Sequence, residues 1–212
     1  MPPRFEVIGI EGIGEVRPGD DIAGLIVDAA RAQGTPLESR DVLVIGQKII
    51  SKAEIVRMDR GIIVSETHHG WVCANAGVDQ SNVDPDTVAL LPEDSDRSAR
   101  QVRERVRALA GADVAVIIAD TFGRPWREGL TNIAIGVAGL APIKSYLGDV
   151  DPSGRPLTAT ILAHADELAG AAELTMGKLD RIPASIVRGF AWAASEEGAK
   201  PLRREPGRDI FR

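Results

Sequence analysis

The sequence predicts an α+β fold in which helices pack on one mixed sheet. Two short runs of apolar residues, at 41–45 and 114–119, are typical of strands buried on both faces. Apolar residues also recur at helical spacing over 98–109 and 158–176. These elements do not follow the regular alternation of repeated βαβ units. The 212 residues therefore predict one domain over 1–212, in which the charged segment 195–212 is a surface tail.

The remaining elements are shorter, and each one ends at a turn signal. Asp20 and Asp21 predict a helix start, because Asp accepts hydrogen bonds from free N–H groups and favours the positive helix end. His68 and His69 lie between two short apolar segments and predict the exposed tip of a hairpin. The predicted elements of this kind are a strand at 5–10, a helix over 22–29, a hairpin of 62–64 with 71–74, and a strand at 182–187.

Composition excludes several classes of function. The net charge of −6 (25 Lys and Arg against 31 Asp and Glu) and the aromatic content of 4% argue against nucleic-acid binding. No run approaches the ~20 apolar residues that a membrane span needs. The single cysteine, Cys73, excludes an intrachain disulfide and, with a start that has no leader pattern, predicts a cytoplasmic protein.

Three polar positions near strand ends form a candidate metal site. Asp79 lies in a stretch of short oxygen-bearing side chains, and Asp120 with Thr121 follows the apolar run at 114–119. Taken alone, the first fits an Asx-rich turn and the second a helix cap or turn. Taken together, the two carboxylates and the hydroxyl are the hard-oxygen ligands that Mg²⁺ or Mn²⁺ prefers.

Three cationic side chains are candidates for binding an anion. Lys52 follows a predicted strand end and could contact a phosphate as a point charge, or lie on the surface. Arg124 and Arg127 come shortly after Asp120 and suggest an anion clamp, or else a solvated charged loop. The Rossmann and P-loop motifs are absent, so a bound nucleotide would need a nonstandard loop. The arginines between 97 and 107 are expected on a solvated helix face.

Several segments resemble one enzyme family, that of coenzyme F420-0:L-glutamate ligase, also called F420 gamma-glutamyl ligase. The resemblance covers residues 5–211, and its long ordered motifs make it specific. The segments that carry it are QKIISKAE at 47–54, NAGVDQSNV at 75–83, LLP at 90–92, DTFGRPWREG at 120–129, ADELA at 165–169 and MGK at 176–178.

The resemblance implies a fold and an activity. Family members have a mixed α/β fold and form an intertwined homodimer. They join L-glutamate to the lactyl carboxylate of the deazaflavin F420-0, using GTP and Mg²⁺ or Mn²⁺, with K⁺ as an optional further ion. Members can add further γ-linked glutamates. We therefore expect a carboxylate activated as an acyl phosphate, which the glutamate amine then attacks.

The resemblance also implies a set of site residues. Asp79, Asp120 and Thr121 match the metal-contacting positions. Lys52, Arg124 and Arg127 are expected to act on the reacting groups. The expected nucleotide contacts lie in an early loop, at two central positions and in a late loop: Ile13, Gly14, Glu15, Val16, Gln47, Lys52, Asn82, Met176, Gly177 and Lys178.

Two positions depart from the family pattern. Some archaeal members carry an acidic residue where this chain has Lys178, and they use that residue on a second metal ion. Members also carry a further helical segment after the position of Lys52. The flavin-binding reductase domain that follows in some relatives is not expected here. A metal-dependent phosphohydrolase and a non-catalytic module that binds deazaflavin or nucleotide are the alternative functions.

Overall fold

A computed structural model describes residues 3–17, 19–50, 53–54, 64–67, 71–74, 88–89, 91–124, 126–205 and 207. None of the helices in these ranges is long and apolar enough to cross a membrane. In chain order the elements are β1 (Glu6–Gly9), α1 (Ile22–Ala32), β2 (Val42–Gly46), α2 (Gln47–Ile50), β3 (Ala53–Glu54), β4 (Val64–Glu66), β5 (Val72–Ala74), β6 (Val88–Ala89), α3 (Ser95–Ala110), β7 (Ala115–Arg124), β8 (Arg127–Ala138), β9 (Lys144–Ser145), β10 (Ile161–Leu162), α4 (His164–Met176), β11 (Ala184–Arg188) and a 3₁₀ turn at Lys200–Leu202.

The central sheet has five strands in the order β1-β11-β2-β7-β8. The β2–β7 pair is parallel, and every other neighbouring pair in this sheet is antiparallel. The prediction of a mixed sheet with packed helices is therefore confirmed. The hairpin predicted around 62–74 is also confirmed in part, since β4 and β5 are antiparallel, while His68 and His69 lie outside the described residues.

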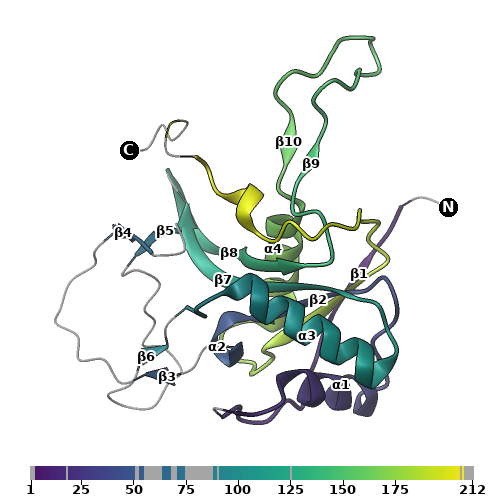
Figure 1. Ribbon diagram of the computed structural model, residues 1–212, viewed down its shortest axis with the longest axis vertical. Coiled ribbons are helices and arrows are strands. Elements are labelled where there is room, and N and C mark those ends of the chain that lie inside the picture. Colours follow the sequence, from purple (N-terminus) through teal and green to yellow (C-terminus); the bar gives the residue numbers. More distant parts are fainter. Residues whose placement is uncertain are drawn as a thin grey trace.

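Helices cover both faces of the sheet, with α1 and α3 on one side and α4 on the other (Figure 1). Alternate residues of β2 pack into the hydrophobic cores on the two faces of the sheet. Leu43 and Ile45 belong to the core with α1 and α3, whereas Val42 and Val44 belong to the core with α4. Successive side chains of a strand point to opposite faces, so both sets are buried. This explains why the central strands are apolar without interruption.

The two long helices on the first side begin at aspartates. The Asp21 carboxylate accepts a hydrogen bond from the N–H of Gly24 (3.1 Å), and Asp94 accepts one from the N–H of Arg97 (2.8 Å). Helix α3 therefore starts at Ser95, three residues before the start that apolar spacing predicts. Its first turn lies so close to β8 that a Cβ on Gly136 would be 2.5 Å from the Ser95 carbonyl carbon.

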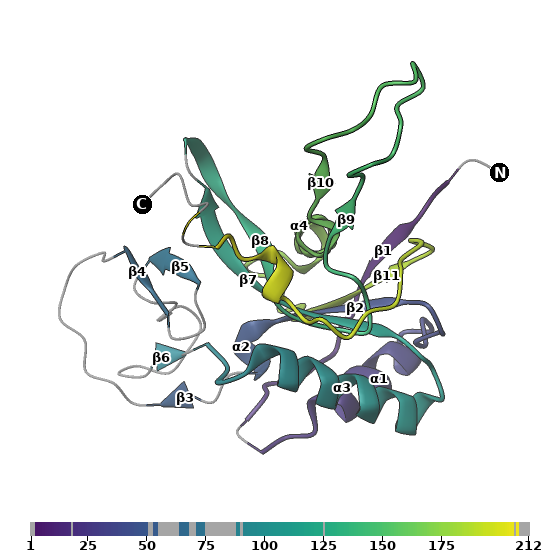
Figure 2. The same ribbon diagram turned by 45° about the horizontal axis from the view of Figure 1, so that its top comes forward.

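The strand predicted to end just before Lys52 is wrong, because Gln47–Ile50 form the short helix α2. Two predicted boundaries are also wrong. The helix predicted over 158–176 begins only at His164, because Ile161 and Leu162 form β10, which pairs with β9 at the base of a projecting arm (Figure 1). The strand predicted to end at 119 continues through Arg124. It turns at Trp126, which has a φ of 56°, and returns as β8, so β7 and β8 extend beyond the sheet as a two-stranded arm (Figure 2).

The segment from Ser195, predicted as a surface tail, contacts α3 and β8. Ala199 is buried, and its N–H donates to Asp96 Oδ1 (2.9 Å). The same oxygen accepts from the N–H of Val137 (2.8 Å) in β8. One carboxylate at the start of α3 therefore connects the edge strand to the C-terminal segment.

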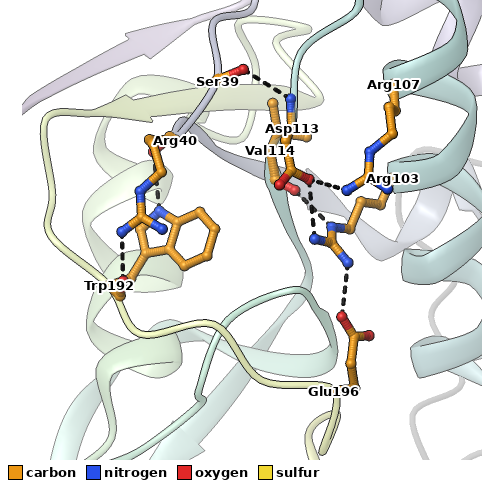
Figure 3. A network of polar contacts seen from close by, with 8 residues as sticks. All are labelled: Ser39, Arg40, Arg103, Arg107, Asp113, Val114, Trp192 and Glu196. Atoms are coloured by element: carbon orange, nitrogen blue, oxygen red, sulfur yellow. Dashed lines mark hydrogen bonds and ion pairs between the residues drawn. The ribbon is translucent and has the colours of Figure 1, made fainter.

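Polar contacts also fix the chain at the amino end of β7 (Figure 3). Arg103 donates to the Val114 carbonyl (3.0 Å), Asp113 (3.1 Å) and Glu196 (2.9 Å). Its side chain is 17% exposed, so Arg103 departs from the predicted solvated face. Nearby, the guanidinium of Arg40 lies 3.9 Å from the centre of the Trp192 ring. These contacts hold one end of the sheet together.

Candidate active site

The carboxyl ends of β1 and β2 lie at one edge of the sheet, where β7 passes them and continues into the β7–β8 arm. These strands run in the same direction, and the register aligns Gly9 with Ser185, Val44 with Ser185, and Gly46 with Ala119. In open parallel α/β sheets, ligands bind outside the carboxyl ends of the strands, and β2 with β7 is the parallel pair of this sheet. We therefore define the segments that leave this edge as the carboxyl-end site.

Four of the predicted segments come together at the carboxyl-end site. The loop at 13–16 follows β1, Gln47 directly follows β2, Asp120 follows the last β7 residue paired with β2, and 176–178 ends α4. The end of β2 lies close to the segment before β11 and to the end of α4. The N–H of Gly46 donates to the Pro183 carbonyl (2.9 Å), and a Cβ on Gly46 would lie 3.4 Å from Met176 Cε.

The early loop divides into a buried part and an exposed part. Ile13 is buried in the core with α1, and Val16 packs against the same core. The side chains of these two residues therefore hold the loop in place. Gly14 and Glu15 are exposed, and nothing lies within 4 Å of a Cβ placed on Gly14. A ligand could thus approach the backbone at this position closely.

The side chains of Gln47 and Met176 are buried, whereas the loop residues Gly14, Glu15 and Lys178 are exposed. Gly177 ends α4 with a φ of 57°, and its N–H donates to the Glu173 carbonyl (3.0 Å). This left-handed turn favours glycine. It directs the chain back toward β7, where Lys178 contacts Thr121.

Asp120 and Thr121 project from opposite faces of β7. Ala119 belongs to the core on the α4 side and Ile118 to the core on the α1 and α3 side. Because side chains alternate along a strand, Asp120 shares the side of Ile118 and Thr121 the side of Ala119. We expected one metal ion to contact both side chains. The two instead diverge across the sheet.

The Thr121 hydroxyl belongs to a chain of hydrogen bonds on the α4 side. Lys178 Nζ donates to Thr121 Oγ1 (2.8 Å), and this oxygen donates to Asn132 Oδ1 (2.9 Å). Asn132 Nδ2 in turn donates to Glu173 Oε2 (2.7 Å). Sequence analysis did not identify Asn132 or Glu173. No local motif marks them, because they lie 41 residues apart and meet only when β8 packs on α4.

The donor set fits a divalent ion in part. Asp120 is a half-buried carboxylate at a strand end, and its oxygens are of the kind that Mg²⁺ and Mn²⁺ prefer. Thr121 fits poorly, because the Lys178 ammonium contacts the same hydroxyl and would repel a second cation. The described residues contain no cluster of three or more His, Cys, Asp or Glu side chains that could hold a metal ion.

The remaining predicted residues lie elsewhere. Lys52, Asp79 and Asn82 are outside the described residues. Arg124 and Arg127 are exposed and pair across the tip of the β7–β8 arm, with Arg124 beyond Asp120 on β7. Arg124 donates to the Glu128 carbonyl (3.2 Å), which fixes one of the two side chains along the arm.

Asp166, in the ADELA segment, supports the edge strand. Its Oδ1 accepts a hydrogen bond from the N–H of Ala134 (2.9 Å). Ala134 lies beside an irregularity in the β7–β8 register, where Ile118 pairs with Gly136 and Ala119 with Ala134. Burial raises the pKa of Asp166, and this hydrogen bond lowers it by less. The Asp166 carboxylate therefore binds the backbone of β8 at this irregularity.

Sequence comparisons place these motifs in one family. The family described as F420-0:Gamma-glutamyl ligase matches residues 11–59 and 53–189. The two ranges overlap at 53–59, where sequence analysis finds a family segment missing. The coenzyme F420:L-glutamate ligase of Methanothermobacter thermautotrophicus is 42% identical over 249 residues, covering 98% of this chain and 99% of the relative.

Two further relatives have the same name. The coenzyme F420:L-glutamate ligase of Methanopyrus kandleri is 42% identical over 252 residues, with 99% of this chain and 97% of the relative covered. That of Haloarcula marismortui is 34% identical over 252 residues, with 98% and 96% covered. With identity and coverage at this level, the chain belongs to the F420-0:gamma-glutamyl ligase family.

Proposed function

We propose that this chain joins L-glutamate to F420-0, in a reaction that uses GTP and a divalent metal ion and takes place at the carboxyl-end site. The observation that carries the proposal is the parallel register of β2 and β7. Because Gly46 aligns with Ala119, Gln47 follows the end of β2 at the level where Asp120 continues β7 without β2 beside it. Family membership supports the ligase activity, and this register supports its location.

The chemical task is to make an amide from a carboxylate, which is a poor electrophile. In the proposed route, an oxygen of the F420-0 carboxylate attacks the γ-phosphorus of GTP, and the bond to the β-phosphate oxygen breaks to release GDP. The glutamate amine then attacks the carbonyl carbon of the acyl phosphate. Inorganic phosphate leaves, and the amine loses a proton. Phosphoryl transfer of this kind depends on positioning and neutralisation of charge.

The roles of Asp79 and Lys52 are proposed from the family resemblance and their charge, and those of the described residues also from their place in the fold. Asp120 and Asp79 would hold the metal ion, which when bound supplies positive charge to the phosphates. Gln47 and the exposed backbone at Gly14 and Glu15 would contact the nucleotide. Lys52 and Lys178 would neutralise phosphate oxygens.

The arm would serve the acceptor half of the reaction. Arg124 and Arg127 are exposed on both strands at its tip, and Asp120 lies further down the same β7 strand. Guanidinium groups suit phosphodiester and carboxylate oxygens. We therefore assign the two arginines to an anionic group of F420-0 or of glutamate.

A homodimer is part of the proposal. The β9–β10 arm projects from the sheet and exposes apolar side chains, including Leu147 (51%), Val150 (63%) and Ile161 (49%). Exposed apolar groups of this kind favour a protein interface. Sedimentation should therefore show a dimer, and an active monomer at assay concentration would contradict this part of the proposal.

The decisive assay combines the protein with GTP, Mn²⁺, F420-0 and labelled glutamate. A ligase forms glutamylated product together with GDP. A phosphohydrolase would release phosphate without glutamate uptake, and a binding module would do neither. Asp79→Asn and Asp120→Asn should each abolish ligation at limiting Mn²⁺. Asp28→Asn is the control, because the Asp28 side chain is 82% exposed on α1. Normal turnover in both test variants would refute the metal assignment.

The assignment of Lys52 to GTP and of Arg127 to F420-0 or glutamate can be tested separately. Lys52→Ala should mainly raise the apparent constant for GTP, and Arg127→Ala that for F420-0 or glutamate. Loss of one charged contact costs about 2–3 kcal/mol, which corresponds to roughly 30- to 150-fold in affinity. If Arg127→Ala altered only the GTP constant, the assignment of the arm to the acceptor would be wrong.

A further inference from the structure

Lys178 is held by a chain of hydrogen bonds that begins at α4. We infer that Glu173, Asn132 and Thr121 are positioning residues that aim the Lys178 ammonium at a phosphate oxygen of the nucleotide. The inference rests on the proposed function, which has the nucleotide bind at the carboxyl-end site. It gives Thr121 the role of a hydrogen-bond acceptor for a lysine.

The chain can run in one direction only. The Glu173 carboxylate accepts hydrogen bonds, so the amide nitrogen of Asn132 faces it at 2.7 Å. The amide oxygen of Asn132 then faces Thr121 at 2.9 Å and takes the single hydroxyl proton. The Thr121 oxygen consequently presents a lone pair to Lys178, whose ammonium group can only donate. Every partner has one consistent role.

Burial keeps this order in place. Asn132 is 4% exposed, and Thr121 on β7 and Glu173 on α4 are half-buried. A hydroxyl or amide that is shielded from water is costly to leave without its partner, so the chain resists reorientation. Lys178 is exposed at the outer end. The inner groups are therefore fixed, while the ammonium group is held at the exposed end of the chain of hydrogen bonds.

The charge arrangement suits an anion. The chain places the neutral Asn132 and Thr121 between Glu173 and Lys178. The positive charge of Lys178 is therefore kept apart from that carboxylate. The bond to Thr121 uses one of the N–H donors of the ammonium, and the others can serve a phosphate oxygen. A lysine in this position acts as a point charge at the carboxyl-end site.

A double-mutant cycle on the full-length protein tests the inference. Lys178→Met keeps the length of the side chain and removes its charge, and it should raise the KM for GTP by about 10- to 100-fold. Glu173→Gln should raise the same KM by about 2- to 10-fold, because the amide of Asn132 can then turn. In the Lys178→Met background, Glu173→Gln should have no further effect on KM.

Two controls separate positioning from general stability. Lys200→Met and Glu104→Gln change exposed residues of the same types away from the site and should leave the KM for GTP unchanged. Thr121→Ser keeps the hydroxyl and should keep the wild-type KM, whereas Thr121→Val should behave like Lys178→Met. If the Thr121→Val variant does not fold, the cycle between positions 173 and 178 still decides the question.

Each outcome has one interpretation. An unchanged KM for GTP in Lys178→Met would overturn the inference, and so would an equal effect of Glu173→Gln in both backgrounds. If the wild-type protein formed no glutamylated product, the proposed function would fail instead. The same cycle would then be measured as GTP binding by calorimetry, where additive effects would overturn the positioning chain on its own.

Discussion

The ion pair between Asp41 and Arg188 should be a main determinant of stability. Arg188 Nε donates to Asp41 Oδ1 (2.9 Å), and Nη2 donates to Oδ2 (2.7 Å). The side chains of Asp41 and Arg188 are 2% and 22% exposed. The bond to Asp41 also raises the pKa of Arg188. This bidentate contact joins the residue before β2 to the last residue of β11, so replacement of either partner should destabilise the sheet.

The two replacements should differ in cost. Arg188→Met leaves a buried carboxylate that keeps the N–H of Glu38 (2.8 Å) but loses its cation. Breaking a buried pair in this way costs about 3–5 kcal/mol. Asp41→Asn is milder, because Arg188 keeps Glu38 (2.8 Å) and the Pro36 carbonyl (2.8 Å), so about 2 kcal/mol is expected. Loss of the ion pair therefore lowers the free energy of unfolding more when the buried carboxylate is left without its cation than when the guanidinium is left without this carboxylate.

Thermal unfolding measures this difference. In a protein of this size each kcal/mol shifts the Tm by roughly 2–4 °C, so Arg188→Met should lower the Tm by about 6–20 °C. Arg105→Met is the matched control, because its ion pair with Asp21 is solvent-exposed and such pairs contribute little. Equal losses for Arg188→Met and Arg105→Met, or a larger loss for Asp41→Asn than for Arg188→Met, would refute the reasoning.

Three further changes test the packing around β8. Gly136→Ala should lower the free energy of unfolding by about 1–3 kcal/mol, because the new Cβ would meet the Ser95 backbone; calorimetry measures this, and an unchanged Tm would contradict it. Burial raises the pKa of Asp166, so the folded state holds this proton more tightly than the unfolded chain, and the charged form costs stability above that pKa. Asp166→Asn should therefore have a higher free energy of unfolding than the wild type at neutral pH, and this difference should disappear in acid. Denaturant unfolding at several pH values measures it. Asp96→Ala should release the segment around Ala199 and speed its proteolysis, and cleavage at the wild-type rate would contradict this.

The sequence predicts the interior of the fold better than its projecting parts. The runs that became β2 and the first half of β7 are buried on both faces, so composition alone identifies them. The second half of β7, from Asp120 to Arg124, is half-buried or exposed, and pairing with β8 defines it. Local sequence carries little information about such pairing. The apolar residues at 161–162 likewise match helical spacing, yet they pair with β9.

The candidate site was predictable where a motif is continuous along the chain. Gln47 and Lys178 belong to segments that could be recognised, and the structure brings both to the carboxyl-end site. No sequence motif identifies Asn132 and Glu173, because their role depends on contacts between distant elements. The opposite directions of the Asp120 and Thr121 side chains could not be predicted for another reason. Adjacent residues share a motif whether they lie in a turn or in a strand, and only in a strand do their side chains diverge.

This divergence constrains how a substrate can occupy the site. A metal ion at Asp120 would lie on the α1 and α3 side of β7, whereas the ammonium of Lys178 lies on the α4 side. Strand β2 pairs with β7 only as far as Ala119, so from Asp120 onward it no longer borders β7. A triphosphate that contacts both groups would therefore have to pass β7 at this point, beside Gln47. Replacement of Gln47 should then weaken GTP binding even when Asp120 and Lys178 are intact, because it alters the passage that connects the two sides.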